Sequence, residues 1–103
     1  MTAVDNNSKI LGELVYSCCA PFVDGYSLCY ELYRRKNTDS DVDAVWLYDL
    51  YISKRDGSEL LDRVVLRAVG SVYYDAVRMC DTALGWSVSC ISAYDFYEEY
   101  ITR

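Results

Sequence analysis

The sequence contains no histidine. Histidine is the usual general base beside a serine or cysteine nucleophile and the commonest metal ligand, so catalytic and metal sites built on it are excluded. Glycine occurs only at five isolated positions, which excludes a glycine-rich phosphate-binding loop. The neighbouring cysteines Cys18 and Cys19 do not have the Cys-x-x-Cys spacing of redox and zinc sites. The sequence therefore predicts a protein that is not an enzyme and that uses no cofactor or metal.

Linkers and long apolar segments are also missing. The chain has one proline, Pro21, and no low-complexity tract, which predicts a single domain over residues 1–103. No apolar run approaches the roughly 20 residues that span a bilayer. Residues 1–8 lack the basic and apolar regions of an export signal. We therefore expect a cytoplasmic protein that makes no contact with membranes.

The five cysteines are odd in number, whereas a secreted disulfide framework usually contains an even number. Together with the missing export signal, this predicts five free thiols that are mostly buried and pack as small apolar side chains. The cysteines stand at Cys18, Cys19, Cys29, Cys80 and Cys90.

The chain is rich in tyrosine and in acidic residues, with eleven tyrosines, sixteen acidic side chains and a net charge of −6. The ten basic residues look scattered along the sequence, whereas a protein that binds nucleic acid needs them clustered, so we expect no direct binding of nucleic acid. Tyrosines supply large contact area at low entropic cost. These features predict a basic or nucleic-acid-binding protein as the partner.

Hydrophobic periodicity predicts an all-α fold, a small compact bundle of about five helices. The clearest helical pattern covers residues 58–84, where apolar residues recur at steps of three and four, with Gly70 inside the helix and Gly85 at its end. Acidic residues precede a predicted helix at 40–55, and basic residues follow it, as the helix dipole favours. The remaining predicted helices cover residues 8–18, 25–36 and 87–101.

An α+β fold is the alternative. Residues 26–35 and 44–53 are rich in tyrosine, valine, tryptophan, leucine and isoleucine, all of which favour strands. Joined by a polar stretch, the two segments predict an antiparallel hairpin packed on helices. The order of the charges favours the helical interpretation, because strands have no dipole that would select it.

Two acidic clusters are the candidate partner-binding residues. The first contains Asp39, Asp41 and Asp43. The second combines carboxylates with tyrosines and contains Tyr94, Asp95, Tyr97, Glu98, Glu99 and Tyr100. In a purely structural interpretation, the first cluster begins a helix and the second is a solvated face with tyrosines half-buried behind it. In a functional interpretation, the carboxylates meet lysine and arginine of a partner while the tyrosines supply contact area.

In size, charge and lack of catalytic motifs, the chain resembles the small acidic proteins with which phages and other mobile elements block host defence, including anti-CRISPR and anti-restriction proteins. The resemblance implies a protein-binding inhibitor of a nucleic-acid-handling host protein, with carboxylates placed where nucleic-acid phosphates would bind. The alternative is a non-catalytic structural or assembly subunit that uses a tyrosine-rich face for homodimerisation or docking.

Overall fold

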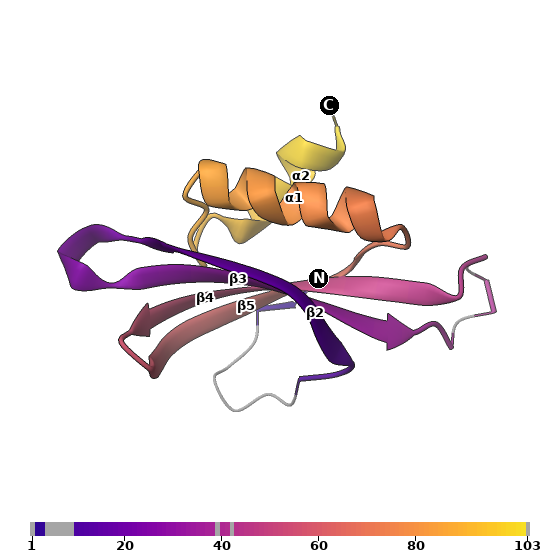
Figure 1. Ribbon diagram of the computed structural model, residues 1–103. Helices are drawn as coiled ribbons and strands as arrows, with labels where there is room; N and C mark the ends of the chain where they lie inside the picture. The colour runs from indigo at the N-terminus through magenta and orange to yellow at the C-terminus, as the bar shows by residue number, and fades with distance from the viewer. Residues whose placement is uncertain (1, 4–9, 39, 42, 103) are drawn as a thin grey trace.

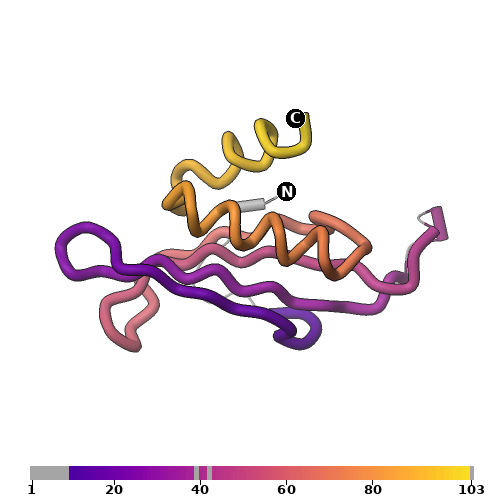
Figure 2. The backbone as a smooth tube through the Cα atoms, turned by 45° about the horizontal axis from the view of Figure 1, so that its top comes forward, coloured from indigo at the N-terminus to yellow at the C-terminus, as the bar shows by residue number. Residues whose placement is uncertain are grey.

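The computed structural model describes residues 2–3, 10–38, 40–41 and 43–102 (Figure 1). Within these residues the elements along the chain are β1 (Thr2–Ala3), β2 (Glu13–Pro21), the 3₁₀ helix η1 (Val23–Gly25), β3 (Ser27–Lys36), β4 (Trp46–Asp56), β5 (Glu59–Gly70), α1 (Tyr73–Gly85) and α2 (Ala93–Ile101). The strands form one antiparallel sheet in the order β1-β5-β4-β3-β2. Both α-helices lie over the same face of the sheet (Figures 1 and 2). The fold is thus a β-rich α+β fold, and the prediction of an all-α bundle is wrong.

The hairpin that we considered as the alternative is the centre of the sheet. Strands β3 and β4 pair without a register shift from Ser27 opposite Arg55 to Lys36 opposite Trp46. The charge order that favoured helices has another cause. Basic residues at the end of β3 form ion pairs with acidic residues of the neighbouring strands, so they do not mark a helix end.

Two further predicted helices are largely strands. The segment 8–18 enters β2 at Glu13, and the first half of 58–84 is β5. The centre of β5, residues 63–66, is buried on both faces, so its side chains face away from water whichever way they point. A strand that is buried on both faces carries runs of consecutive apolar residues, and such runs can be mistaken for helical spacing. The second half of 58–84 is the helix α1, and the predicted helix 87–101 is confirmed over α2 only.

Helix α1 has Gly85 as its last residue, but the left-handed residue that completes the helix end is Ser87. The backbone N–H of Ser87 donates to Leu84 O at 3.1 Å, and that of Val88 donates to Ala83 O at 3.0 Å. This pair of hydrogen bonds is a Schellman motif, in which the residue with a left-handed backbone is usually glycine. Here Ser87 takes that position with φ of 52°. Gly70, which we placed inside a helix, ends β5.

The core lies between the sheet and the two helices. On the strands its fully buried side chains alternate with those of the opposite face, as in Leu28, Tyr30 and Leu32 of β3. Helix α1 contributes Ala76, Cys80 and Ala83, which share one helical face. The hydroxyl of Tyr30 donates to Val88 O at 2.8 Å, so this buried polar group is satisfied and ties β3 to the connection between the helices.

The cysteines do not all remain free. Cys19 and Cys29 are directly opposite each other on β2 and β3 and form a disulfide, which leaves Cys18, Cys80 and Cys90 as thiols. The prediction of five free thiols is therefore wrong. It failed because an odd number of cysteines requires only that one of them stays unpaired. Whether the others form disulfides depends on which of them the strand register places opposite each other. Disulfides persist in oxidising compartments, so the cysteines no longer support a cytoplasmic location.

Candidate functional site: an acidic helix and a basic cleft

Helix α2 carries the second acidic cluster on its outer surface. Asp95, Glu98 and Glu99 are exposed, and their spacing of three and four residues places them on one side of the helix. The three tyrosines of the cluster, Tyr94, Tyr97 and Tyr100, are half-buried. Tyr97 and Tyr100 pack against the core. The structure thus brings this predicted cluster together and shows that its outward side chains are mainly carboxylates.

A hollow of about 200 Å³ lies beside α2, between the acidic side chains and the end of α1. Trp86, Asp95 and Glu99 line it together with Val88, Ser92 and Phe96. The Trp86 side chain is 40 % exposed and stands edge-to-face on Phe96, with ring centroids 5.5 Å apart. Trp86 is not among the partner-binding residues that the sequence predicted. The sequence did offer one signal that this tryptophan is exposed: it directly follows the predicted end of a helix, outside the apolar face of that helix.

The first acidic cluster lies elsewhere. Asp41 and Asp43 are exposed in the loop between β3 and β4, while Asp39 lies outside the described residues. The loop is closed by Asn37, whose backbone N–H donates to Val45 O at 2.9 Å and whose side-chain amide donates to Ala44 O at 2.8 Å. It extends from the end of the sheet, away from the helical layer (Figure 1). Its described members, Asp41 and Asp43, begin no helix, and the structure does not join them to α2.

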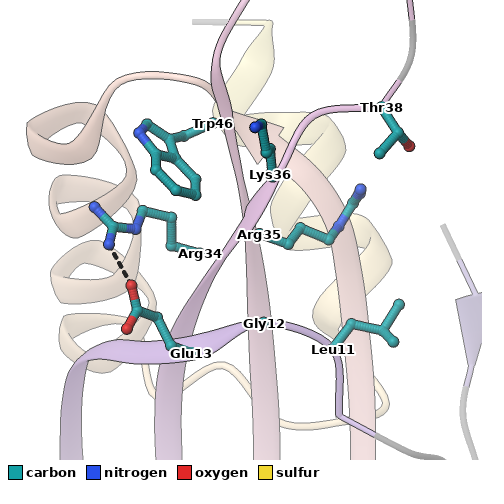
Figure 3. Close-up of a pocket in the computed structure, with 8 residues that line it drawn as sticks. All are labelled: Leu11, Gly12, Glu13, Arg34, Arg35, Lys36, Thr38 and Trp46. Atoms are coloured by element: carbon teal, nitrogen blue, oxygen red, sulfur yellow. Dashed lines mark hydrogen bonds and ion pairs between the residues drawn. The ribbon is translucent and has the colours of Figure 1, made fainter.

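The end of β3 forms a basic cleft that the sequence did not reveal. Figure 3 shows this cleft of about 560 Å³, lined by Leu11, Gly12, Glu13, Arg34, Arg35, Lys36, Thr38 and Trp46. Arg34 and Arg35 point to opposite sides of the strand (Figure 3). The Arg34 guanidinium forms an ion pair with Glu13 and lies over the Trp46 ring at 4.2 Å from its centroid. Arg34 is therefore held by the protein itself.

Arg35 forms an ion pair with Asp49, a wholly buried carboxylate on β4. Its Nε donates to Asp49 Oδ2 at 2.8 Å, and Arg67 on β5 donates to the same oxygen at 3.1 Å. The other oxygen of Asp49 accepts the backbone N–H of Ala68 at 2.8 Å. Ala68 sits in a β-bulge, where the register of β4 and β5 shifts, and has a φ of 53°. The bulge aims this N–H at the carboxylate.

The basic residues are therefore less scattered than the sequence suggested. Arg35 and Arg67 are distant in the chain, yet both reach one carboxylate oxygen because β3, β4 and β5 are neighbours. The run Arg34-Arg35-Lys36 stands at the end of the helix that we predicted over residues 25–36, a position that the helix dipole favours for basic residues. A signal was available in the sequence. Asp49 stands within an otherwise apolar strand-forming segment, and a carboxylate buried there needs a basic partner on a neighbouring strand.

Titratable groups with raised pKa values lie between β2 and α1. The Tyr16 hydroxyl donates to Asp81 Oδ1 at 2.5 Å, and this hydrogen bond raises the pKa of Tyr16 to about 12. The sulfur atoms of Cys18 and Cys80 are 3.9 Å apart, and burial raises the pKa of both thiols. Both therefore stay protonated at neutral pH, and a protonated thiol is a poor nucleophile.

Among the described residues, no three cysteine, aspartate or glutamate side chains are grouped so as to hold a metal ion. In the same part of the chain, neither helix has the length and apolar character needed to cross a bilayer.

Comparison with known proteins adds no relative. No family model matches the chain, and neither a curated protein nor a solved structure matches it. Nothing in these comparisons supports the anti-defence inhibitor that the composition suggested, and the helical character that we predicted beside it is corrected above. The function is therefore argued from the two surfaces alone.

Proposed function

We propose that this chain is a protein-binding protein, and that the surface of α2 holds a basic segment of its partner. We define the α2 surface as Trp86, Asp95, Glu98 and Glu99. The observation that carries the proposal is the combination of an exposed tryptophan and two carboxylates around one hollow. A lysine or arginine in this hollow would meet carboxylates for its charge and an aromatic ring for its aliphatic stem.

The charge distribution supports a basic partner. Residues 71–102 contain five acidic side chains and one basic side chain, Arg78. Arg78 lies 3.9 Å from Asp75 on α1, so it does not neutralise the carboxylates of α2. Most of the basic residues are on β3, β4 and β5. The helical layer therefore presents a negative field, which would steer a positively charged partner and accelerate its association.

The size of the hollow favours a protein over a small molecule. Its volume of about 200 Å³ is below the roughly 300–1,000 Å³ typical of small-molecule sites. It matches a single anchoring side chain within a larger contact. Interfaces of this kind draw most of their binding energy from a few central aromatic and arginine side chains, surrounded by polar contacts that exclude water.

A library of random peptides tests this proposal, because the protein itself selects the sequences that it binds. Peptides selected for binding to the wild-type protein should be enriched in lysine and arginine. They should bind the triple variant Asp95→Lys, Glu98→Lys and Glu99→Lys much more slowly, because the carboxylates act mainly on association. Trp86→Ala should instead accelerate dissociation, with a loss of about 2 kcal/mol if Trp86 is a central anchor.

The variant Asp41→Lys and Asp43→Lys is the control, because it reverses exposed charges outside the α2 surface. It should change association much less than the triple variant does. If basic peptides bind the triple variant and the wild-type protein equally well at low salt, the proposed function is wrong. In that case the assembly subunit becomes the better proposal.

One observation favours that second candidate. Tyr74 at the start of α1 is 75 % exposed and packs edge-to-face on Tyr73, with ring centroids 5.4 Å apart. Val72 beside them is 52 % exposed, so this corner presents apolar area suited to a second copy. Sedimentation at increasing concentration would then show a dimer that persists in high salt and is lost in Tyr74→Ser.

A further inference from the structure

We propose that the basic cleft at the end of β3 binds a small ligand that carries a phosphate group, with Arg35 and Thr38 as the residues that hold it. This site is separate from the α2 surface. It is an open cleft whose volume of about 560 Å³ falls within the range of about 300–1,000 Å³ that is usual for small-molecule sites. A second cleft of about 390 Å³ adjoins it, and Arg35 and Thr38 line both.

Arg35 is prepared for an anion. Asp49 engages its Nε, and within the described residues its two terminal nitrogens have no hydrogen-bond partner. The Arg35 side chain is 26 % exposed, and its bond to Asp49 restricts the direction of the guanidinium. An arginine oriented in this way presents parallel N–H groups to two oxygens of a phosphate, which makes the bonds both strong and directional. A buried carboxylate beneath it reduces the entropy lost on binding.

The surroundings of Arg35 provide the rest of such a site. Lys36 is exposed, and no ion pair with a described residue occupies its ammonium. The Thr38 hydroxyl is exposed on the same side of β3 as Arg35 (Figure 3). Arginine, lysine and threonine are usual donors to phosphate oxygens. Three of the eight residues that line the cleft are basic and one is acidic, so the cleft is locally positive in a chain of net charge −6.

The cleft also has apolar walls for the remainder of the ligand. Trp46 is 37 % exposed and Leu11 is 46 % exposed, on opposite sides of β3 (Figure 3). Inorganic phosphate would use only the polar donors, whereas a phosphate ester with an aromatic or apolar part would also contact one of these walls. An aromatic phosphate ester should therefore bind more tightly than phosphate itself.

Nuclear magnetic resonance with residue-resolved signals tests the proposal on the full chain. Inorganic phosphate and AMP should both shift the Nε–H signal of Arg35 and the amide signal of Thr38, with AMP binding more tightly. Adenosine, which lacks the phosphate, should not shift them. Arg35→Gln should weaken AMP binding by about tenfold or more, because it removes charge-assisted hydrogen bonds.

Lys36→Gln and Thr38→Val keep the test valid if Arg35→Gln fails to fold, because both residues are exposed and neither touches Asp49. Each should weaken AMP binding severalfold. The control is Arg78→Gln, which removes one exposed positive charge from α1 and should leave the affinity unchanged.

The proposal is overturned if phosphate and AMP leave the cleft signals unmoved, if adenosine binds as well as AMP, or if Arg78→Gln weakens binding as much as Lys36→Gln. It is also overturned if a single-stranded oligonucleotide binds far more tightly than AMP with a steep salt dependence, because the surface would then be a nucleic-acid track.

Discussion

Replacing Asp49 with asparagine is expected to lower the free energy of unfolding by about 2–3 kcal/mol. Asp49 is wholly buried and accepts hydrogen bonds from Arg35, Arg67 and the backbone of Ala68. Removing one partner of a buried ion pair generally costs about 3–5 kcal/mol. The two arginine side chains are 26 % and 29 % exposed, so water can solvate part of the charge that they would leave uncompensated. We therefore expect a loss below that range.

Urea denaturation measures this loss. With a dependence on urea of about 1–3 kcal/mol per molar, the midpoint should fall by about 0.7–3 M. Asp75→Asn is the matched control, because it makes the same chemical change in the exposed Asp75–Arg78 pair, where the side chains are 67 % and 72 % exposed. That variant should lose no more than about 0.5 kcal/mol, as is usual for surface pairs on a helix.

A comparison of the two variants shows whether the buried carboxylate stabilises the fold. If Asp49→Asn unfolds at the same urea concentration as Asp75→Asn, the buried carboxylate does not stabilise the sheet. The argument that it holds Arg35 in place for a ligand would then lose its basis as well.

Three further predictions address other parts of the fold. The hydrogen bond to Asp81, together with burial and the charge of Asp81, raises the pKa of Tyr16 from the ordinary 10.0 to about 12. The resulting stabilisation should be complete below pH 10, should disappear as the pH rises from 10 to 12, and should be absent from Tyr16→Phe in denaturation series across this range. Ser87→Gly should raise the free energy of unfolding by about 1 kcal/mol, because glycine adopts the left-handed backbone without strain; an unchanged or lowered urea midpoint would contradict this. Titration with a thiol reagent should find three thiols per chain in denaturant and five after reduction, and little reaction in the native protein, since burial raises the pKa of the three free thiols. Five reactive thiols without reduction would exclude the Cys19–Cys29 disulfide.

Local patterns in the sequence identified part of the fold. The strand-forming composition of residues 26–35 and 44–53 indicated the β3–β4 hairpin, although the order of charges led us to prefer helices there. The spacing of Ala76, Cys80 and Ala83 indicated the buried face of α1, and the spacing of Asp95, Glu98 and Glu99 placed three carboxylates on one side of α2. These signals are local because a helix or hairpin brings together residues that are close in the chain.

The main errors came from contacts between distant segments. In β5 the apolar residues are consecutive because both faces of the strand are buried, and a window of sequence cannot distinguish this from a helix. The Cys19–Cys29 disulfide depends on strand register. Within the candidate sites, the sequence indicated the carboxylates of α2 but neither the exposed Trp86 beside them nor the basic cleft.

The amino-acid composition establishes an acidic, tyrosine-rich chain without histidine, and hence a chain without histidine-based catalysis or metal binding. The places where the charges gather follow from the tertiary fold. Sheet pairing places Arg35 and Arg67 on one buried carboxylate, while the helices carry an excess of acidic side chains. The physical reason is that electrostatic interactions depend on distance in space. The separation of an acidic helical layer from a basic cleft therefore exists only once β3, β4 and β5 have paired.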